Sequence, residues 1–128
     1  MFTFRNLAAV SMFLFGTTFM WLTPMFVAGE PKPKGYAWTL VSILSWVVMA
    51  GFTAGAWAIF KELSWWEPVA TASAIVGIVT VVAYWLAATW TGEVVGAALN
   101  LVIHAAGIAG VFVATMFRPV NDWMTAHI

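Results

Sequence analysis

The sequence predicts an all-α integral membrane protein, folded as a four-helix transmembrane bundle with short loops. Composition is the first reason: of 128 residues, 63% are hydrophobic and only 8% are charged, with a mean hydropathy of +0.95. Soluble domains carry about 25% charged residues, so a free cytosolic or secreted domain is excluded. The second reason is pattern, because four apolar runs reach the roughly 20 residues that a membrane helix needs. Asp, Glu, Lys and Arg fall at the ends of these runs.

We expect one domain, residues 1–128, with spans at about 6–28, 36–60, 68–91 and 93–117. Arg5 before the first run resembles the start of a signal peptide. That run exceeds the apolar core of about 7–15 residues in such peptides, so it is interpreted as a retained helix. Pro24 is expected to kink its end, because proline cannot continue the helical hydrogen bonding.

The breaks between the spans have ordinary chemistry. Residues 29–35 hold two Gly and two Pro with charges between them, which is typical of a loop. Pro68 suits the start of the third helix, where no backbone N–H is needed. The link Thr91-Gly92-Glu93 is so short that the third and fourth helices must form an antiparallel hairpin. Arg118-Pro119 ends the fourth helix and leaves a short tail.

The nine tryptophans predict two interfacial belts of the kind that anchor membrane helices. Only Trp46 lies near the middle of a span. Basic residues favour the cytoplasmic side, and Arg5, Lys61 and Arg118 outnumber Lys32 and Lys34. Both termini are therefore expected to be cytoplasmic. The belt residues are Trp21, Trp38, Trp85 and Trp90 at one end, and Trp57, Trp65, Trp66 and Trp123 at the other.

His104 is the one ionisable side chain near the middle of a span, which makes it a candidate functional residue. Folding the chain about Gly92 places Thr80 level with His104, and Tyr84 level with Asn100. Thr80 and Tyr84 share one face of the third helix, and Asn100 and His104 share one face of the fourth. We therefore expect a polar ladder between these two helices. Two interpretations stay open: hydrogen bonds that hold the helices together, or a ligand or proton site built on these four residues.

Four glycines are expected to let helices approach closely. Gly51 and Gly55 form a GxxxG motif in the second span, and Gly77 and Gly107 share the depth of the ladder. The motif serves either packing within the chain or a face between copies. The hydroxyls of Ser42 and Ser45 are expected to bond back to their own helix.

Other chemistry is poorly supported by the sequence. There is no cysteine and no cluster of metal ligands, so neither a metal site nor catalytic residues are expected, and the protein is not predicted to be an enzyme. A net charge of zero argues against nucleic-acid binding. Haem stays possible as a cofactor if His104 pairs with Met49 or with a second copy's histidine.

These observations favour a non-catalytic subunit or partner in a larger membrane assembly. The alternative is a small homo-oligomeric transporter, channel or intramembrane ligand-binding protein with a site near His104. The expected partners are the lipid bilayer and either further copies of the chain or other membrane subunits.

Overall fold

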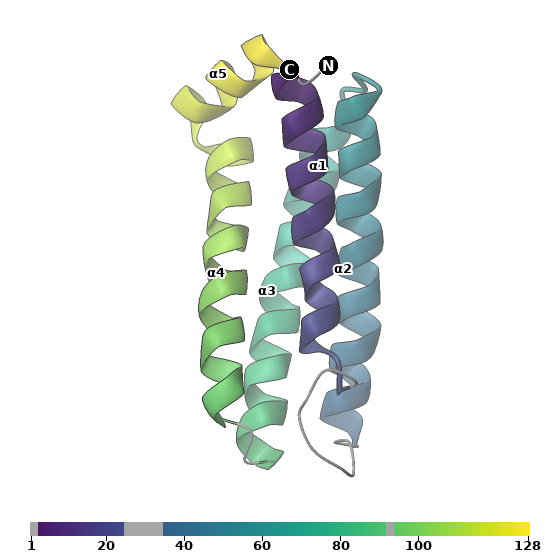
Figure 1. Cartoon of the computed structure of the whole chain (residues 1–128), viewed down its shortest axis with the longest axis vertical. Coiled ribbons are helices and arrows are strands. Elements are labelled where there is room, and N and C mark those ends of the chain that lie inside the picture. Colours follow the sequence, from purple (N-terminus) through teal and green to yellow (C-terminus); the bar gives the residue numbers. More distant parts are fainter. Residues whose placement is uncertain (1–2, 25–34, 92–93) are drawn as a thin grey trace.

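The computed structural model describes residues 3–24, 35–91 and 94–128, with the backbone alone for residues 90, 91 and 94–97. Its regular structure within these ranges is helical, as the sequence predicts, and three of the helices are long and apolar enough to cross a membrane. The elements are α1 (Phe4–Thr17), the 3₁₀ helix η1 (Thr18–Leu22), α2 (Tyr36–Phe60), α3 (Trp66–Thr91), α4 (Val94–Met116) and α5 (Arg118–His127) (Figure 1).

The first helical segment differs from the continuous helix expected over 6–28. The α-helix ends at Thr17 and tightens into η1. The hydroxyl of Thr18 donates to the Phe15 carbonyl at 2.6 Å, a backbone contact that competes with regular helix geometry. Thr23 is extended, because a residue before proline is pushed out of the α conformation. Residues 25–28 of the predicted span lie outside the described residues.

The second helix, α2, has the predicted bounds. It ends because Glu62 adopts the left-handed conformation (φ 60°), and the Leu63 N–H then donates to the Ala58 carbonyl at 2.8 Å. This is a Schellman cap with Glu62 in the place usually taken by glycine. The Glu62 carboxylate also pairs with the Arg5 guanidinium. The cap turns the chain out of α2, and the ion pair joins this turn to the start of α1.

The next helix, α3, begins at Trp66, slightly before the predicted start. Pro68 therefore sits in the first turn, where a backbone N–H has no acceptor within the helix. The fourth helix ends at Met116, close to the predicted boundary.

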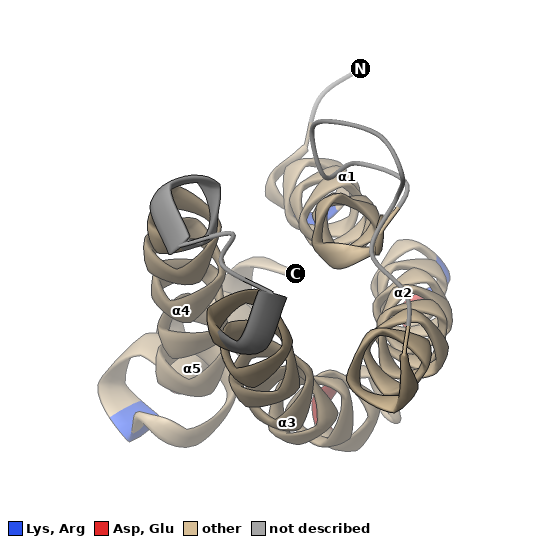
Figure 2. Cartoon of the chain, turned by 90° about the horizontal axis from the view of Figure 1, so that it is seen from below, with Lys and Arg blue, Asp and Glu red and all other residues tan. Residues whose placement is uncertain are grey.

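The four long helical segments stand side by side in the order α1, α2, α3, α4 (Figure 2). The packing of α2 involves both α1 and α3, and α4 packs along α3. The side of the bundle between α4 and α1 is the more open one (Figure 2). Both ends of the described chain lie at the same end of the bundle (Figure 1).

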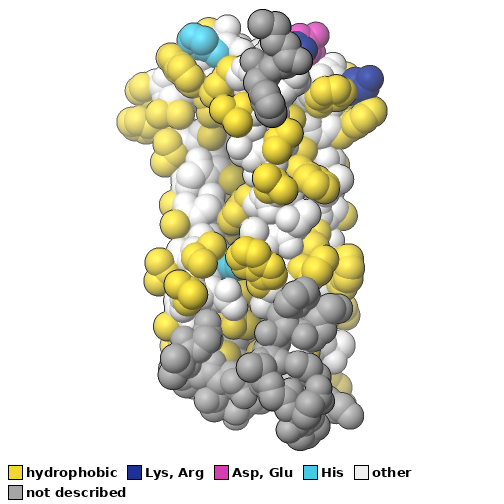
Figure 3. All heavy atoms as spheres, in the orientation of Figure 1, with side chains coloured by type: hydrophobic (Ala, Val, Ile, Leu, Met, Phe, Trp, Pro, Cys, Tyr) yellow, Lys and Arg dark blue, Asp and Glu magenta, His cyan; other side chains and the backbone are white. Residues whose placement is uncertain are grey.

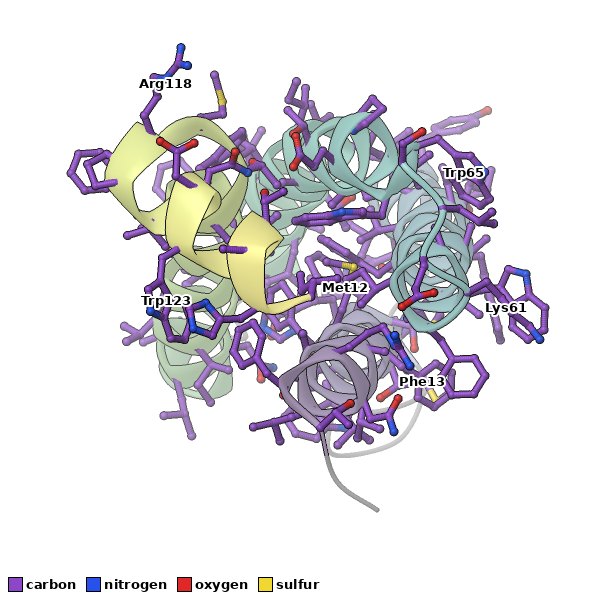
Figure 4. All side chains as sticks on the ribbon, turned by 90° about the horizontal axis from the view of Figure 1, so that it is seen from above. Met12, Phe13, Lys61, Trp65, Arg118 and Trp123 are labelled. Atoms are coloured by element: carbon purple, nitrogen blue, oxygen red, sulfur yellow. The ribbon has the colours of Figure 1, made fainter. Side chains whose placement is uncertain are left out.

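The residues after Pro119, expected to be a short tail, form most of a helix instead. In α5, Pro119 lies in the first turn, where its locked φ favours helix initiation. The helix lies across the end of the bundle (Figures 1 and 4). Asn121 holds it there, because its side-chain amide donates to Glu67 Oε1 at 3.1 Å and to the Ala114 carbonyl at 3.0 Å.

Two members of the predicted tryptophan belts do not face outward. Trp38 and Trp66 are buried inside the bundle, whereas Trp21, Trp57, Trp65, Trp85 and Trp123 are exposed. The side chain of Trp90 lies outside the described residues. Figure 4 shows Trp65 and Trp123 pointing away from the bundle. Depth along a span can be counted from sequence, but the direction of a side chain around the helix depends on which neighbours pack against it.

Candidate functional site

The expected bond between the third and fourth helices is present at Tyr84 and Asn100. The side-chain amide of Asn100 donates to the Tyr84 hydroxyl oxygen at 3.1 Å. Tyr84 is buried, and its ring meets the Trp38 ring edge-on with 5.9 Å between centroids. One rung of the predicted ladder therefore links α4 through α3 to α2.

The second expected rung, between His104 and Thr80, is absent. Both residues are fully buried, but the Thr80 hydroxyl donates to the Val76 carbonyl of its own helix at 2.8 Å. His104 turns instead toward the first helical segment. Its Nε2 lies 3.0 Å from the Thr18 carbonyl oxygen, and its Nδ1 lies 2.8 Å from the Asn100 carbonyl oxygen.

The imidazole of His104 is thus held between two backbone carbonyls. A neutral imidazole has a single N–H and donates to one of them, whereas an imidazolium donates to both. Three aromatic rings surround it: those of Phe15, Phe19 and Trp21, with centroids 6.2, 4.8 and 6.4 Å from the imidazole centroid. Both ring nitrogens face the protein, so the arrangement ties α4 to η1.

The GxxxG motif packs inside the chain. A Cβ on Gly51 would lie 2.1 Å from Ser73 Oγ, which shows how closely α2 approaches α3 there. A Cβ on Gly55 would lie 2.9 Å from Met12 Sδ, and Figure 4 shows Met12 pointing from α1 toward the bundle interior. Of the two interpretations of this motif, packing within the chain accounts for both glycines.

Gly77 and Gly107 do not pack against each other as their shared depth suggested. A Cβ on Gly77 would come within 3.2 Å of Phe19 Cζ and 3.3 Å of Ile108 Cδ1. A Cβ on Gly107 would lie 2.1 Å from Phe15 Cε1. Both glycines therefore make room for phenylalanines of the first helical segment, which the hairpin argument did not include.

Buried hydroxyls mostly bond to their own helices. Ser42 Oγ donates to the Trp38 carbonyl at 3.0 Å, as expected. The expectation for Ser45 is wrong, because its fully buried Oγ has no hydrogen-bond partner. The indole N–H of Trp38 is likewise buried without a partner. Sequence reasoning missed both, since nothing in the local pattern distinguishes Ser45 from Ser42.

Within the described ranges, no three His, Asp or Glu side chains lie close enough to hold a metal ion. The polar groups at the centre of the bundle can hold helices together. To bind a ligand through His104, the ring would have to leave at least one of its two carbonyl partners.

Comparison with known proteins gives no match to a family model, to a curated protein or to a solved structure.

Proposed function

We propose that this chain is a four-span integral membrane protein that serves as a non-catalytic subunit of a larger membrane assembly, and that it docks through α4. The observation that carries the proposal is a stripe on α4 that the rest of the chain leaves exposed. Its residues are Leu99, Val102, Ala106, Ala109, Val113 and Met116.

Their spacing of three and four residues is that of a helix-packing seam. Small residues let the backbones of membrane helices approach each other, and Ala106 and Ala109 occupy the middle of the stripe. The corresponding exposed stripe on α3 has bulky side chains at Ile75, Val79 and Val82. In the apolar stretch of α4 that could cross a membrane, only 11% of the residues are buried inside the bundle, against 44% in the corresponding stretch of α2. The α4 stripe is therefore the face best suited to another transmembrane helix.

Membrane insertion with four crossings is supported by lengths. Three helices, α2, α3 and α4, are by themselves long and apolar enough to cross a membrane. The 14 residues of α1 and the 5 of η1 rise together about 31 Å, which matches a hydrocarbon core of about 30 Å. An even number of crossings leaves both termini on one side, and the excess of basic residues there favours the cytoplasm. On this arrangement α5 lies along the membrane surface, as short amphipathic helices do.

The contacts of the buried polar side chains support a role without catalysis. The hydroxyl of Thr80 already donates to a backbone carbonyl, and each ring nitrogen of His104 faces a backbone carbonyl oxygen. A haem iron would need the lone pair of a ring nitrogen, and both ring nitrogens face carbonyl oxygens. The alternative of a ligand site at His104 is favoured by one observation, the insertion of an ionisable side chain at mid-span.

The test is site-specific photocrosslinking in the native membrane. A photoreactive amino acid replaces Val102, Ala106 or Val113 on the seam, and Ile75 or Val79 of α3 serves as the control. We expect the three seam positions to capture one and the same membrane polypeptide, and the α3 positions not to capture it.

A matched pair of variants tests the same face by assembly. Ala106→Trp should abolish the complex seen by native mass spectrometry, whereas Ala72→Trp on the exposed face of α3 should leave it intact. Crosslinks only between copies of this chain, with masses that are multiples of 13.9 kDa, would contradict the proposal in favour of the homo-oligomer. A monomer in both measurements would contradict both.

A further inference from the structure

A groove of about 450 Å³ runs between α1 and α4. Figure 3 shows this face of the molecule. Ala8 and Ser11 of α1 form one wall, and Gly110 and Ala114 of α4 form the other. The groove stays open at Gly110, because a Cβ built on that glycine meets no atom within 4 Å. The groove lies between α1 and α4, the first and last of the four helices in the row seen in Figure 2.

The groove extends from mid-depth in the bundle to the end near the chain termini. At mid-depth the Phe15 ring fills the space above Gly107, so closely that a Cβ there would overlap it. At the other end Phe4 and Met124 line the groove. The Phe4 ring is held edge-on against Trp123 of α5, with centroids 4.9 Å apart. The groove therefore covers only part of the length of the bundle.

The length of the groove matches the thickness of one leaflet of a bilayer. From Phe4 to Phe15 an α-helix rises about 16 Å, and half of a hydrocarbon core of about 30 Å is about 15 Å. A transmembrane helix from another chain must cross both leaflets, so a groove of this length would hold only part of it. A linear chain that enters from the side fits.

The lining is apolar. Thr115 donates its hydroxyl to the Val111 carbonyl of its own helix at 2.9 Å. The other polar groups in the lining are the Ser11 hydroxyl and the indole N–H of Trp66. The volume lies within the range of about 300–1,000 Å³ typical of small-molecule sites. Because apolar side chains predominate, such a surface suits a hydrocarbon chain better than a polar substrate.

We propose that the α1–α4 groove binds one acyl chain of a phospholipid, taken from the leaflet on the side of the chain termini. This rests on the proposed membrane insertion, and it is independent of the α4 seam, which lies on another face of α4. Bound there, the chain would fill the gap between α1 and α4 that the protein's own side chains leave open.

The test uses the full chain in vesicles of palmitoyl-oleoyl phosphatidylcholine. A small fraction of this lipid carries a photoreactive diazirine at the middle of one acyl chain. After illumination, peptide mass spectrometry maps the labelled residues. We expect labelling at Met12, Gly110 and Ala114 in excess of labelling at Ile43 and Val79, which are exposed on the outer faces of α2 and α3.

Substitutions in both walls of the groove test whether the labelling depends on the space between them. Ser11→Leu and Ala114→Leu each fill the groove and should cause loss of the excess labelling, whereas Ser11→Ala removes only the hydroxyl and should keep it. Far-ultraviolet circular dichroism checks that the variants stay helical. The wild-type ratio of groove to outer-face labelling stands as evidence even if a variant fails to fold.

Equal labelling of the groove and the outer faces would overturn the lipid site and leave membrane insertion intact. An absence of labelling anywhere on the chain would overturn both. Persistence of the excess in Ser11→Leu and in Ala114→Leu would also overturn the site, because a filled groove has no room for the acyl chain.

Discussion

His104 Nε2 lies 3.0 Å from the carbonyl oxygen of Thr18, so the middle of α4 is joined to the 3₁₀ turn that ends the first helical segment. The two residues are 86 positions apart. Direct packing between α4 and the first segment is limited, since α4 lies mainly against α3. This contact therefore joins α4 to the first helical segment, where the two pack little against each other.

The first prediction concerns this contact. His104→Leu introduces an apolar side chain of similar size and removes both contacts to backbone carbonyls. Polar contacts between membrane helices contribute about 0.6 kcal/mol on average, so we expect a small loss of stability and a lower Tm in detergent, with insertion unchanged. Thr80→Val is the control, because the Thr80 hydroxyl bonds only within its own helix. A variant of unchanged stability whose cellular role is lost would show instead that His104 is a functional residue.

The second prediction concerns Tyr84 and Asn100. Tyr84→Phe removes the hydroxyl that accepts the Asn100 amide, and Asn100→Leu removes the donor. Each single variant should lower the free energy of unfolding, and the double variant should cost less than the sum of the two. A double-mutant cycle in mixed micelles should give a coupling of about 0.6 kcal/mol. Strict additivity would mean that the two side chains do not interact.

The third prediction contrasts the two glycines of the GxxxG motif. Gly51→Ala brings a methyl group within 2.1 Å of Ser73 Oγ, and Ser73 Cβ is also close at 3.1 Å. Gly55→Ala meets the flexible end of Met12 at 2.9 Å, which can move aside. Thermal unfolding should therefore show a clearly larger loss for Gly51→Ala.

A compensating change tests the cause. Ser73→Gly should restore much of the stability of Gly51→Ala, because it removes both atoms that the new methyl group meets. Failure of this rescue, or equal losses at the two glycines, would show that α2 and α3 pack differently from the arrangement described.

The fourth prediction concerns Ser45, whose buried Oγ has no partner. An unsatisfied buried polar group costs about 1–3 kcal/mol, so Ser45→Ala should leave the protein as stable or make it more stable. Ser42→Ala is the matched control on the same helix, since Ser42 already donates to Trp38. Chemical unfolding in detergent compares the two. A large loss for Ser45→Ala would reveal a partner for this hydroxyl.

Much of the helical layout could be predicted because it depends on local chemistry. Alternation of apolar runs with charges and prolines placed α2 at its observed bounds and the ends of α3 and α4 within a few residues. The bond between Tyr84 and Asn100 could be predicted because a short hairpin link fixes the register of adjacent helices. The prediction missed the amphipathic α5, because a proline that ends one helix can also stand in the first turn of the next.

The helical class, the apolar helices and the bond between Tyr84 and Asn100 follow from the order of the amino acids alone. Three features depend on how the helices pack: His104 contacts Thr18, Phe15 lies against Gly107, and a groove lies between α1 and α4. The physical reason is that a membrane helix is apolar on its lipid-facing and its protein-facing sides alike. Hydropathy therefore locates each span along the chain, but only the packing of all the helices together selects the face that each one turns inward.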